Sequence, residues 1–318
     1  MRPTIPLALG TAVLACIAGA PAGATAARPV YRELKAETPT WYTPDLHRRV
    51  LAAGPQGVPL PAGAREDIPA SGLGFVGIRP GSWMIAPAGC TMNFIFQGGT
   101  TSTTGGKKPR SGPKDRSVVS AKAGSTAFDP AQQLYIGTAG HCTEVGDQVT
   151  LVAVTPTAPN PVLVNIGRTV KSVDSGVGND FALVEINPAL NSWVSPAMAH
   201  FGGPTGTWSG TELLPVVHSG HGLVVGTGGT PRAGQVLYAH ETDALYWAGA
   251  TVFGDSGSAL NTATGLAAAD ITHLIVDLKY PGANSAGTRI AKMLQIAGKD
   301  LATCSVAVPW PAPGCPPV

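Results

Sequence analysis

"ATVFGDSGS", residues 250–258, is the stretch on which the interpretation of this 318-residue chain depends. Gly, Asp and Ser all favour turns, so the run could be an ordinary surface loop. The same residues also suit a loop that presents a serine nucleophile beside backbone N–H groups able to stabilise an oxyanion. The second interpretation requires the rest of the chain to supply a base, an orienting acid and a scaffold that brings them together.

Two upstream segments offer the base and the acid. "IGTAGHC" places His141 after a predicted strand and a glycine turn, and "GNDFALVEI" places Asp180 at the start of an apolar strand. A serine nucleophile needs a base within hydrogen-bond reach, and that base needs an acid that fixes its tautomer. We therefore expect His141, Asp180 and Ser256 to form a catalytic triad.

The chain order of these residues discriminates between the folds that use such a triad. An α/β-hydrolase has Ser before Asp before His, with Gly two residues after the serine, where this chain has Ser258. A subtilisin-like enzyme has its Asp ahead of its His and alternates strands with helices. Only the chymotrypsin-type order of His, Asp and Ser fits.

The remaining pattern predicts an all-β protein. From Ile78 onward, short apolar runs are separated by Gly, Pro, Asn and Asp, which indicates many short strands in a barrel or sandwich. The runs are "CTMNFIF", "QLYIGTAG", "DQVTLVAV", "PVLVNIG", "DFALVEI" and "HGLVVGTG". One helix is predicted near the end, in "RIAKMLQIAGKDL", as a face docked on the barrel. Its apolar positions are Ile290, Met293, Leu294, Ala297 and Leu301.

"TAGHC", "NDFALVEI" and "GDSGS" resemble the three signature segments of the chymotrypsin-like (trypsin-like) serine endopeptidases. "GIRPGSWMIAPAGCTMNFIF" is similar to the start of the bacterial secreted branch, which includes the streptogrisins and α-lytic protease. The resemblance covers roughly residues 75–300. It implies an all-β fold of two antiparallel six-stranded β-barrels, with the active site between them and a C-terminal α-helix.

The resemblance also implies roles for the site residues. His141 is the general base and later the general acid, Asp180 orients it, and Ser256 attacks the scissile carbonyl. The backbone N–H groups of Gly254 and Ser256 form the oxyanion hole, and a buried Asp255 braces the loop. Bacterial relatives pair the residue matching Asp255 with an internal arginine. Arg232 is the candidate for that partner; the alternative is a turn arginine that faces water.

The specificity pocket is predicted from two positions. Ala250, six residues before the nucleophile, corresponds to the floor of the pocket, and its lack of charge predicts an apolar P1 residue (the residue before the scissile bond). His273, in "DITHL", corresponds to the pocket wall, where glutamate-specific relatives place a histidine. A glutamate preference is therefore the alternative.

The chain begins with features of an export signal. Arg2 is followed by an apolar run too short for a membrane span and by a small-residue cleavage site, so we predict a signal peptide over residues 1–26 and a secreted protein. Acylation of Cys16 as a lipoprotein is the minor alternative. Three further segments follow: an N-terminal extension or pro-segment at 27–75, the protease domain at 76–303, and a Pro-rich tail at 304–318.

Removal of the signal leaves four cysteines, Cys90, Cys142, Cys304 and Cys315, which suggests two disulfides in an exported chain. Four cysteines allow three pairings, and four free thiols are the alternative in a reducing compartment. Pairing of Cys304 with Cys315 closes a short Pro-rich loop and leaves Cys90 for Cys142. A bridge flanking the histidine also matches the resemblance.

Charge and motifs exclude several other functions. A formal net charge of +2 does not favour nucleic acid or a stable membrane association, and we interpret a basic cluster within residues 98–116 as a solvated loop. His218 and His221 lack the converging ligands that zinc needs, so we expect neither metal nor cofactor. We expect a monomer acting on protein or peptide substrates. The alternatives are a catalytically silent secreted binding protein (a pseudoprotease) and an extracellular esterase on the same scaffold.

Overall fold

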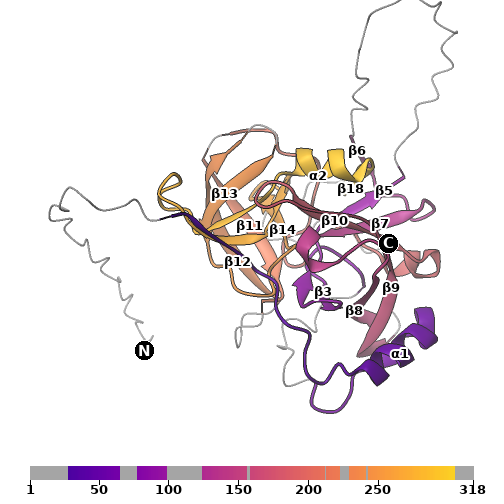
Figure 1. Cartoon of the computed structure of the whole chain (residues 1–318). Helices are drawn as coiled ribbons and strands as arrows, with labels where there is room; N and C mark the ends of the chain where they lie inside the picture. Colours follow the sequence, from indigo (N-terminus) through magenta and orange to yellow (C-terminus); the bar gives the residue numbers. More distant parts are fainter. Residues whose placement is uncertain are drawn as a thin grey trace, which may run out of the picture.

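The computed structural model describes residues 28–64, 77–98, 124–155, 158–211, 213–222, 229–240 and 243–304. Two β-sheets dominate this part of the chain, and two α-helices accompany them (Figure 1). The predicted signal peptide with Cys16, the basic cluster of residues 107–116 and the part of the tail that holds Cys315 lie outside the described residues. None of the helices in the described ranges combines the length and apolarity of a membrane-spanning segment.

The larger sheet has the strand order β4-β3-β8-β9-β10-β7-β5-β18-β6, with β2 paired to β9 as its tenth strand. All its pairings are antiparallel except that of β18 with β6. Its strands are β2 (Val58–Pro59), β3 (Trp83–Ala86), β4 (Cys90–Thr91), β5 (Ile95–Gln97), β6 (Ser125–Ala127), β7 (Leu134–Thr138), β8 (Gln148–Thr155), β9 (Ala158–Asp174), β10 (Asp180–Ile186) and β18 (Asp300–Thr303).

The smaller sheet is antiparallel throughout and has the order β1-β16-β17-β13-β12-β11-β14-β15. Its strands are β1 (Val30–Glu33), β11 (Leu214–Gly220), β12 (Thr230–Ala239), β13 (Ala244–Gly249), β14 (Ala259–Thr262), β15 (Ala267–Asp270), β16 (His273–Val276) and β17 (Ser285–Thr288). The helices are α1 (Pro44–Ala53) and α2 (Ile290–Ala297), and short 3₁₀ turns occupy Gly54–Gln56, Gly140–Cys142 and Pro188–Trp193.

The prediction of a predominantly β protein is therefore confirmed, whereas the six-stranded count is not. The described strands pair into sheets of ten and eight because segments outside the expected barrels also join them. The N-terminal segment contributes β1 to one sheet and β2 to the other, and β18 returns to the larger sheet after α2.

The apolar runs of the sequence form the cores of these sheets. Every residue of β7 is buried, and six of the seven residues of β10 are buried, as expected for strands covered on both faces. Figure 1 shows these two strands side by side, with α2 packed over the neighbouring part of the sheet. Burial on both faces fixes the ends of β7 and β10, where two of the candidate site residues, His141 and Asp180, lie.

Helix α2 is shorter than the predicted stretch of residues 289–301. Ile290, Met293, Leu294 and Ala297 form its buried face, as expected from their spacing, but the helix ends before Gly298. Gly298 adopts the left-handed conformation (φ 62°) that commonly terminates helices. Leu301 was expected on the same helical face, and this was wrong: it lies in β18, so α2 is not the last element of the chain.

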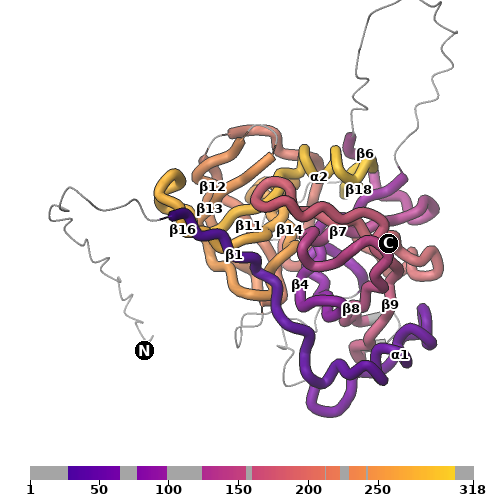
Figure 2. The backbone as a smooth tube through the Cα atoms, viewed as in Figure 1, coloured from indigo at the N-terminus to yellow at the C-terminus, as the bar shows by residue number. Residues whose placement is uncertain are grey.

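The N-terminal segment, residues 28–64, packs against both sheets. β1 pairs with β16 at the edge of the smaller sheet, and β2 pairs with β9 of the larger one. Between them, α1 begins at a Thr43 cap followed by Pro44, and it buries Leu46 and Val50 in an apolar cluster with residues of β3 and β9. Figure 2 shows this indigo chain running from β16 across the molecule to α1.

Candidate active site

The three residues of the predicted triad lie on segments that the fold brings together. His141 lies in the 3₁₀ turn after β7, and Asp180 is the first residue of β10. Because β7 and β10 are paired neighbours, the end of one strand lies beside the start of the other. Ser256 lies in the loop between β13 and β14 of the smaller sheet.

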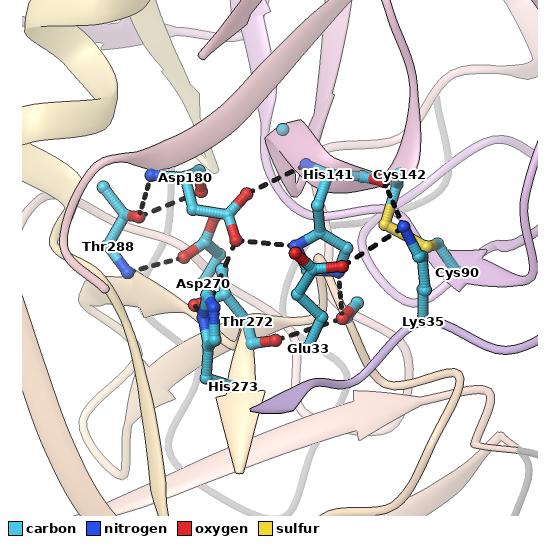
Figure 3. Close-up of polar contacts among 12 residues, drawn as sticks. Glu33, Lys35, Cys90, His141, Cys142, Asp180, Asp270, Thr272, His273 and Thr288 are labelled. Carbon is cyan, nitrogen blue, oxygen red and sulfur yellow. Dashed lines mark hydrogen bonds and ion pairs between the residues drawn. A yellow bond between two sulfur atoms is a disulfide. The ribbon is translucent and has the colours of Figure 1, made fainter. Parts of the chain in front are cut away.

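Direct hydrogen bonds join these side chains in series, and Figure 3 shows the contact between Asp180 and His141. His141 Nδ1 is 2.6 Å from Asp180 Oδ2, and His141 Nε2 is 2.7 Å from Ser256 Oγ. Asp180 Oδ1 also accepts the backbone N–H of His141 at 3.1 Å, which fixes the carboxylate relative to the turn that carries the ring. A proton on Nδ1 leaves Nε2 free to accept the proton of the serine hydroxyl.

The triad side chains are shielded from solvent. The side chains of His141 and Asp180 are 1% and 0% exposed, and Ser256 is fully buried. Ser256 Oγ also lies 3.2 Å from the Thr272 carbonyl oxygen, a second acceptor within reach of the single hydroxyl proton. Removal from water strengthens each charge–dipole interaction in the site. The arrangement therefore places a serine hydroxyl, an imidazole and a carboxylate in hydrogen-bonded contact in a water-excluded environment, a geometry that can activate the hydroxyl as a nucleophile.

A second carboxyl lies behind Asp180. Asp270, the last residue of β15, is fully buried, and its Oδ1 accepts the Thr288 N–H at 2.7 Å. Burial, together with the negative charge of Asp180, raises the pKa of Asp270 well above its usual range. Asp270 did not emerge from the sequence, although an acidic residue after three alanines in "AAAD" was a usable signal.

His273 lies next to the triad. Its Nδ1 is 2.8 Å from Thr272 Oγ1 and 3.7 Å from Asp180 Oδ2, and its ring is edge-on to His141 with centroids 5.9 Å apart. Burial lowers its pKa, while the nearby Asp180 carboxylate acts in the opposite direction. The part assigned to His273 in specificity stays a prediction.

The loop that carries Ser256 is held by Asp255. The fully buried Asp255 carboxylate forms a bidentate ion pair with Arg232, with Nη2 at 2.7 Å from Oδ1 and Nη1 on Oδ2. It also accepts the backbone N–H groups of Gly222 and Val252 at 2.9 and 2.8 Å. Of the two alternatives for Arg232, the structure supports the internal partner of Asp255; the side chain does not face water.

The expected oxyanion donor Gly254 adopts a backbone conformation that favours glycine. Its φ is +99°, a region that L side chains rarely occupy, and its N–H donates to the carbonyl oxygen of Leu34. The N–H of Gly254 therefore points at a peptide carbonyl, as an oxyanion donor must.

Ala250 is exposed just after β13, and its carbonyl accepts from His218 Nε2 at 2.9 Å. Its part in specificity stays a prediction.

Cys90 and Cys142 are joined in a disulfide, the pairing expected beside the histidine. These cysteines and His141 place three potential metal ligands within 4.8 Å of one another. The two sulfur atoms are bonded to each other, and His141 is engaged by Asp180 and Ser256, so this group suits no metal ion as it stands. Cys304 is buried at the end of β18, and its expected partner Cys315 lies outside the described residues.

His218 and His221, which are not expected to bind zinc, lie against tryptophan side chains. The His218 ring is edge-on to Trp247, with centroids 5.2 Å apart, and His221 stacks on Trp83 at 6.1 Å. Burial lowers the pKa of His218 to about 4, so the ring is neutral over the range in which most proteins are stable. Both rings are thus part of aromatic packing.

Comparisons with known proteins yielded solved structures only: no protein-family model and no curated protein matches the chain. Protease A of Thermobifida fusca is 20% identical with a TM-score of 0.43, and the match covers 72% of this chain and 98% of that one. The Nocardiopsis protease NAPase is 17% identical with a TM-score of 0.39 and the same coverages. The HtrA-type protease AlgW with a decapeptide is 21% identical with a TM-score of 0.34, covering 48% of this chain and 44% of that one. Similarity at this level does not assign a function, and membership of the streptogrisin branch stays a prediction.

Proposed function

We propose that this chain is a serine endopeptidase that hydrolyses peptide bonds through an acyl-enzyme formed on Ser256. The observation that carries the proposal is the continuous hydrogen-bonded series from Asp180 through His141 to Ser256. A serine hydroxyl is a weak nucleophile until a base removes its proton, and here the base is in contact with it.

The proposed reaction has two halves. Ser256 Oγ attacks the substrate carbonyl while His141 Nε2 takes its proton, and the Asp180 carboxylate stabilises the imidazolium that forms. The N–H groups of Gly254 and Ser256 stabilise the oxyanion, and His141 returns the proton to the departing amine. Water then attacks the ester with His141 again as the base, and Ser256 is restored.

The ion pair of Asp255 with Arg232 supports this assignment. An oxyanion hole lowers the barrier only when its donors are held in place before charge develops. Asp255 lies between Gly254 and Ser256, so its buried contacts with Arg232, Gly222 and Val252 fix the loop from within the protein. The loop is thus preorganised by residues inside the chain.

We further propose secretion and an apolar P1 preference. The disulfide between Cys90 and Cys142 supports an oxidising compartment. The nearest charged partner of the His273 ring is the Asp180 carboxylate, which disfavours the approach of a substrate carboxylate. This environment supports the apolar preference over the glutamate one.

A fluorophosphonate probe tests the proposed nucleophile. After the purified chain has been incubated until its mass no longer changes, we expect one adduct, which peptide mapping places on Ser256. Ser256→Ala should abolish the adduct. Ser258→Ala is the matched control, because Ser258 is a fully buried serine of the same loop, and it should still be labelled. Equal labelling of the wild type and Ser256→Ala would contradict the proposal.

A paired set of amide and ester substrates separates the remaining alternatives. A protease should hydrolyse both an apolar peptide anilide and the matching ester, whereas an esterase should hydrolyse the ester alone. A pseudoprotease should hydrolyse neither and should remain unlabelled. Because the intact triad geometry supports a working nucleophile, we expect hydrolysis of both substrates.

A further inference from the structure

Residues 30–36 of the chain pass directly over the triad. β1 pairs antiparallel with β16, with Glu33 opposite His273 and Arg32 opposite Leu274. The pairing continues one residue further, where the Leu34 N–H donates to the Thr272 carbonyl at 3.0 Å. Figure 2 shows β1 lying along β16 at the edge of the smaller sheet. Thr272 is also the residue whose carbonyl oxygen lies 3.2 Å from Ser256 Oγ, so this strand runs past the nucleophile.

The carbonyl of Leu34 occupies the place expected for a scissile carbonyl. Its oxygen accepts the N–H of Gly254, the donor assigned to the oxyanion hole. A residue whose N–H is bound on one side and whose carbonyl oxygen accepts from an oxyanion donor on the other presents that carbonyl for attack. The peptide bond that follows this carbonyl joins Leu34 to Lys35.

The chain beyond that bond is held as well. Ala36 and Gly89 exchange two backbone hydrogen bonds, at 2.8 and 2.9 Å, and Gly89 directly precedes the disulfide-bonded Cys90. Lys35 Nζ lies 3.5 Å from the His141 carbonyl oxygen and 3.1 Å from Glu33. Figure 3 shows Glu33 and Lys35 beside His141. The Leu34–Lys35 bond is therefore fixed from both sides beside the triad.

The side chain of Leu34 is the anchor of this segment. Leu34 is fully buried and belongs to an apolar cluster with Trp247 of β13 and with Ile271, which lies between β15 and β16. Its neighbours Arg32 and Lys35 are exposed, and Arg32 lies over the ring of Phe253 at 4.8 Å. One buried apolar side chain in an otherwise exposed strand is the pattern of a substrate recognised through its P1 residue.

We infer that the Leu34–Lys35 bond is a substrate of the same molecule's Ser256, an inference that rests on the proposed function. Ser256 Oγ attacks the Leu34 carbonyl carbon, and its proton passes to His141. The bond from Leu34 to the Lys35 nitrogen then breaks, and His141 gives its proton to that nitrogen. Water hydrolyses the Leu34 ester, so the net reaction consumes one water and leaves a carboxylate on Leu34 and an amine on Lys35.

This cut also opens the site. In the intact chain Ser256 is fully buried, and β1 fills the position along β16 that another peptide would need. After cleavage, the part of the N-terminal segment before the cut is held by non-covalent contacts alone, namely its edge pairing with β16, the buried Leu34 side chain and Arg32 over Phe253, so it can dissociate. The part after the cut stays attached through α1 and β2, whose residues share an apolar cluster with β3. The active form therefore begins at Lys35 and prefers leucine or a similar apolar residue at P1.

N-terminal sequencing and intact mass of the full chain during incubation test the inference. We expect the wild type and Ser258→Ala to acquire Lys35 as their N-terminus, with a first-order rate constant that does not change with protein concentration. Ser256→Ala should keep the bond intact. Leu34→Asp should slow cleavage of this bond by at least about 100-fold, because it places a carboxylate in an apolar site, whereas Leu34→Met should be cut.

The outcomes separate this inference from the proposed function. The charged side chain of Leu34→Asp should not fit the apolar cluster, so β1 should no longer cover Ser256. The fluorophosphonate should then reach Ser256 while the bond between residues 34 and 35 stays intact. If Leu34→Asp is labelled while the wild type stays uncut, self-cleavage is overturned and the proposed protease stands. Equal cleavage of Ser256→Ala and the wild type overturns self-cleavage too. If neither chain is cut or labelled, the proposed function fails, and the inference fails with it.

Discussion

Asp180 and Asp270 are two fully buried aspartates that both hydrogen-bond to a single residue, Thr288, Asp270 through its carboxyl group and Asp180 through its backbone. The Thr288 N–H donates to Asp270 Oδ1 at 2.7 Å, and its hydroxyl donates to the Asp180 carbonyl oxygen at 2.9 Å (Figure 3). Two negative charges in this space would repel one another strongly, and the raised pKa of Asp270 avoids this repulsion. The structure therefore favours the neutral form of Asp270 beside Asp180.

Asp270→Asn tests this distribution of charge. A raised pKa in the folded state means that the unfolded chain loses the Asp270 proton first as the pH rises. The wild type is thus destabilised progressively between the ordinary aspartate pKa and the raised one. In a Ser256→Ala background, we expect Asp270→Asn to raise the free energy of unfolding at pH 7 and to leave it unchanged near pH 3, as measured by urea denaturation. A loss of stability at pH 7 would show that Asp270 is ionised there.

Asp180→Asn should abolish the proper hydrogen bonding of His141. The carboxylate uses both oxygens, one for the His141 backbone N–H and one for Nδ1, whereas the amide has a single acceptor oxygen and no charge to stabilise the imidazolium. We therefore expect kcat on an apolar peptide anilide to fall by about 10⁴-fold. Asp174→Asn is the control, because Asp174 is exposed and lies opposite Asp180 in the pairing of β9 with β10. Its kcat should be unchanged. Comparable losses in both variants would argue against a specific part for Asp180.

Arg232→Gln should destabilise the protein by about 3–5 kcal/mol, since it leaves the buried Asp255 carboxylate without its counter-charge. Urea denaturation in the Ser256→Ala background measures this change. The same substitution with Ser256 present should slow fluorophosphonate labelling, because the loop then loses its brace. Arg168→Gln on β9 is the exposed control and should change stability by less than about 0.5 kcal/mol. Equal effects of the two substitutions would contradict the assignment.

His218 predicts a second pH dependence, on the acidic side. Its pKa is 6.5 in the unfolded chain and about 4 in the folded one, so protonation favours the unfolded chain as the pH falls from 6.5 to 4. The stability lost over that window is about 3 kcal/mol at 1.36 kcal/mol per unit. His218→Gln keeps a donor for the Ala250 carbonyl and removes the titration. We expect a flatter stability profile between pH 4 and 6.5, and an unchanged slope would refute the assignment.

Motif spacing in the sequence predicted those parts of the site that depend on local patterns. The segments around His141, Asp180 and Ser256 predicted three side chains that the structure brings into contact, and Arg232 was the one arginine between Asp180 and Ser256. Their catalytic roles remain proposals. The β-rich fold followed from the short apolar runs between turn residues.

The parts that depend on long-range pairing were not predictable in this way. "VYRELKAE" has no apolar periodicity, so nothing in it indicates a strand; its one buried side chain, Leu34, becomes significant only against β16. Leu301 fits the helical spacing as well as Leu294 does, but Gly298 ends the helix between them. The proximity of Asp270 to the triad could not be predicted either, because it depends on Thr288, which lies on another strand of the sheet.

Because β1 is covalently attached to the rest of the chain, it competes with free peptides for the edge of β16 at an advantage. A segment attached by a short connection reaches its site at an effective concentration on the order of millimolar, whatever the dilution of the protein. A free peptide at micromolar concentration would therefore be outcompeted about a thousandfold for the edge of β16. Each molecule then meets its own strand before any other substrate. Under the proposed self-cleavage, hydrolysis of the Leu34–Lys35 bond is irreversible in dilute solution, so each molecule would release β1 from the edge of β16 once only.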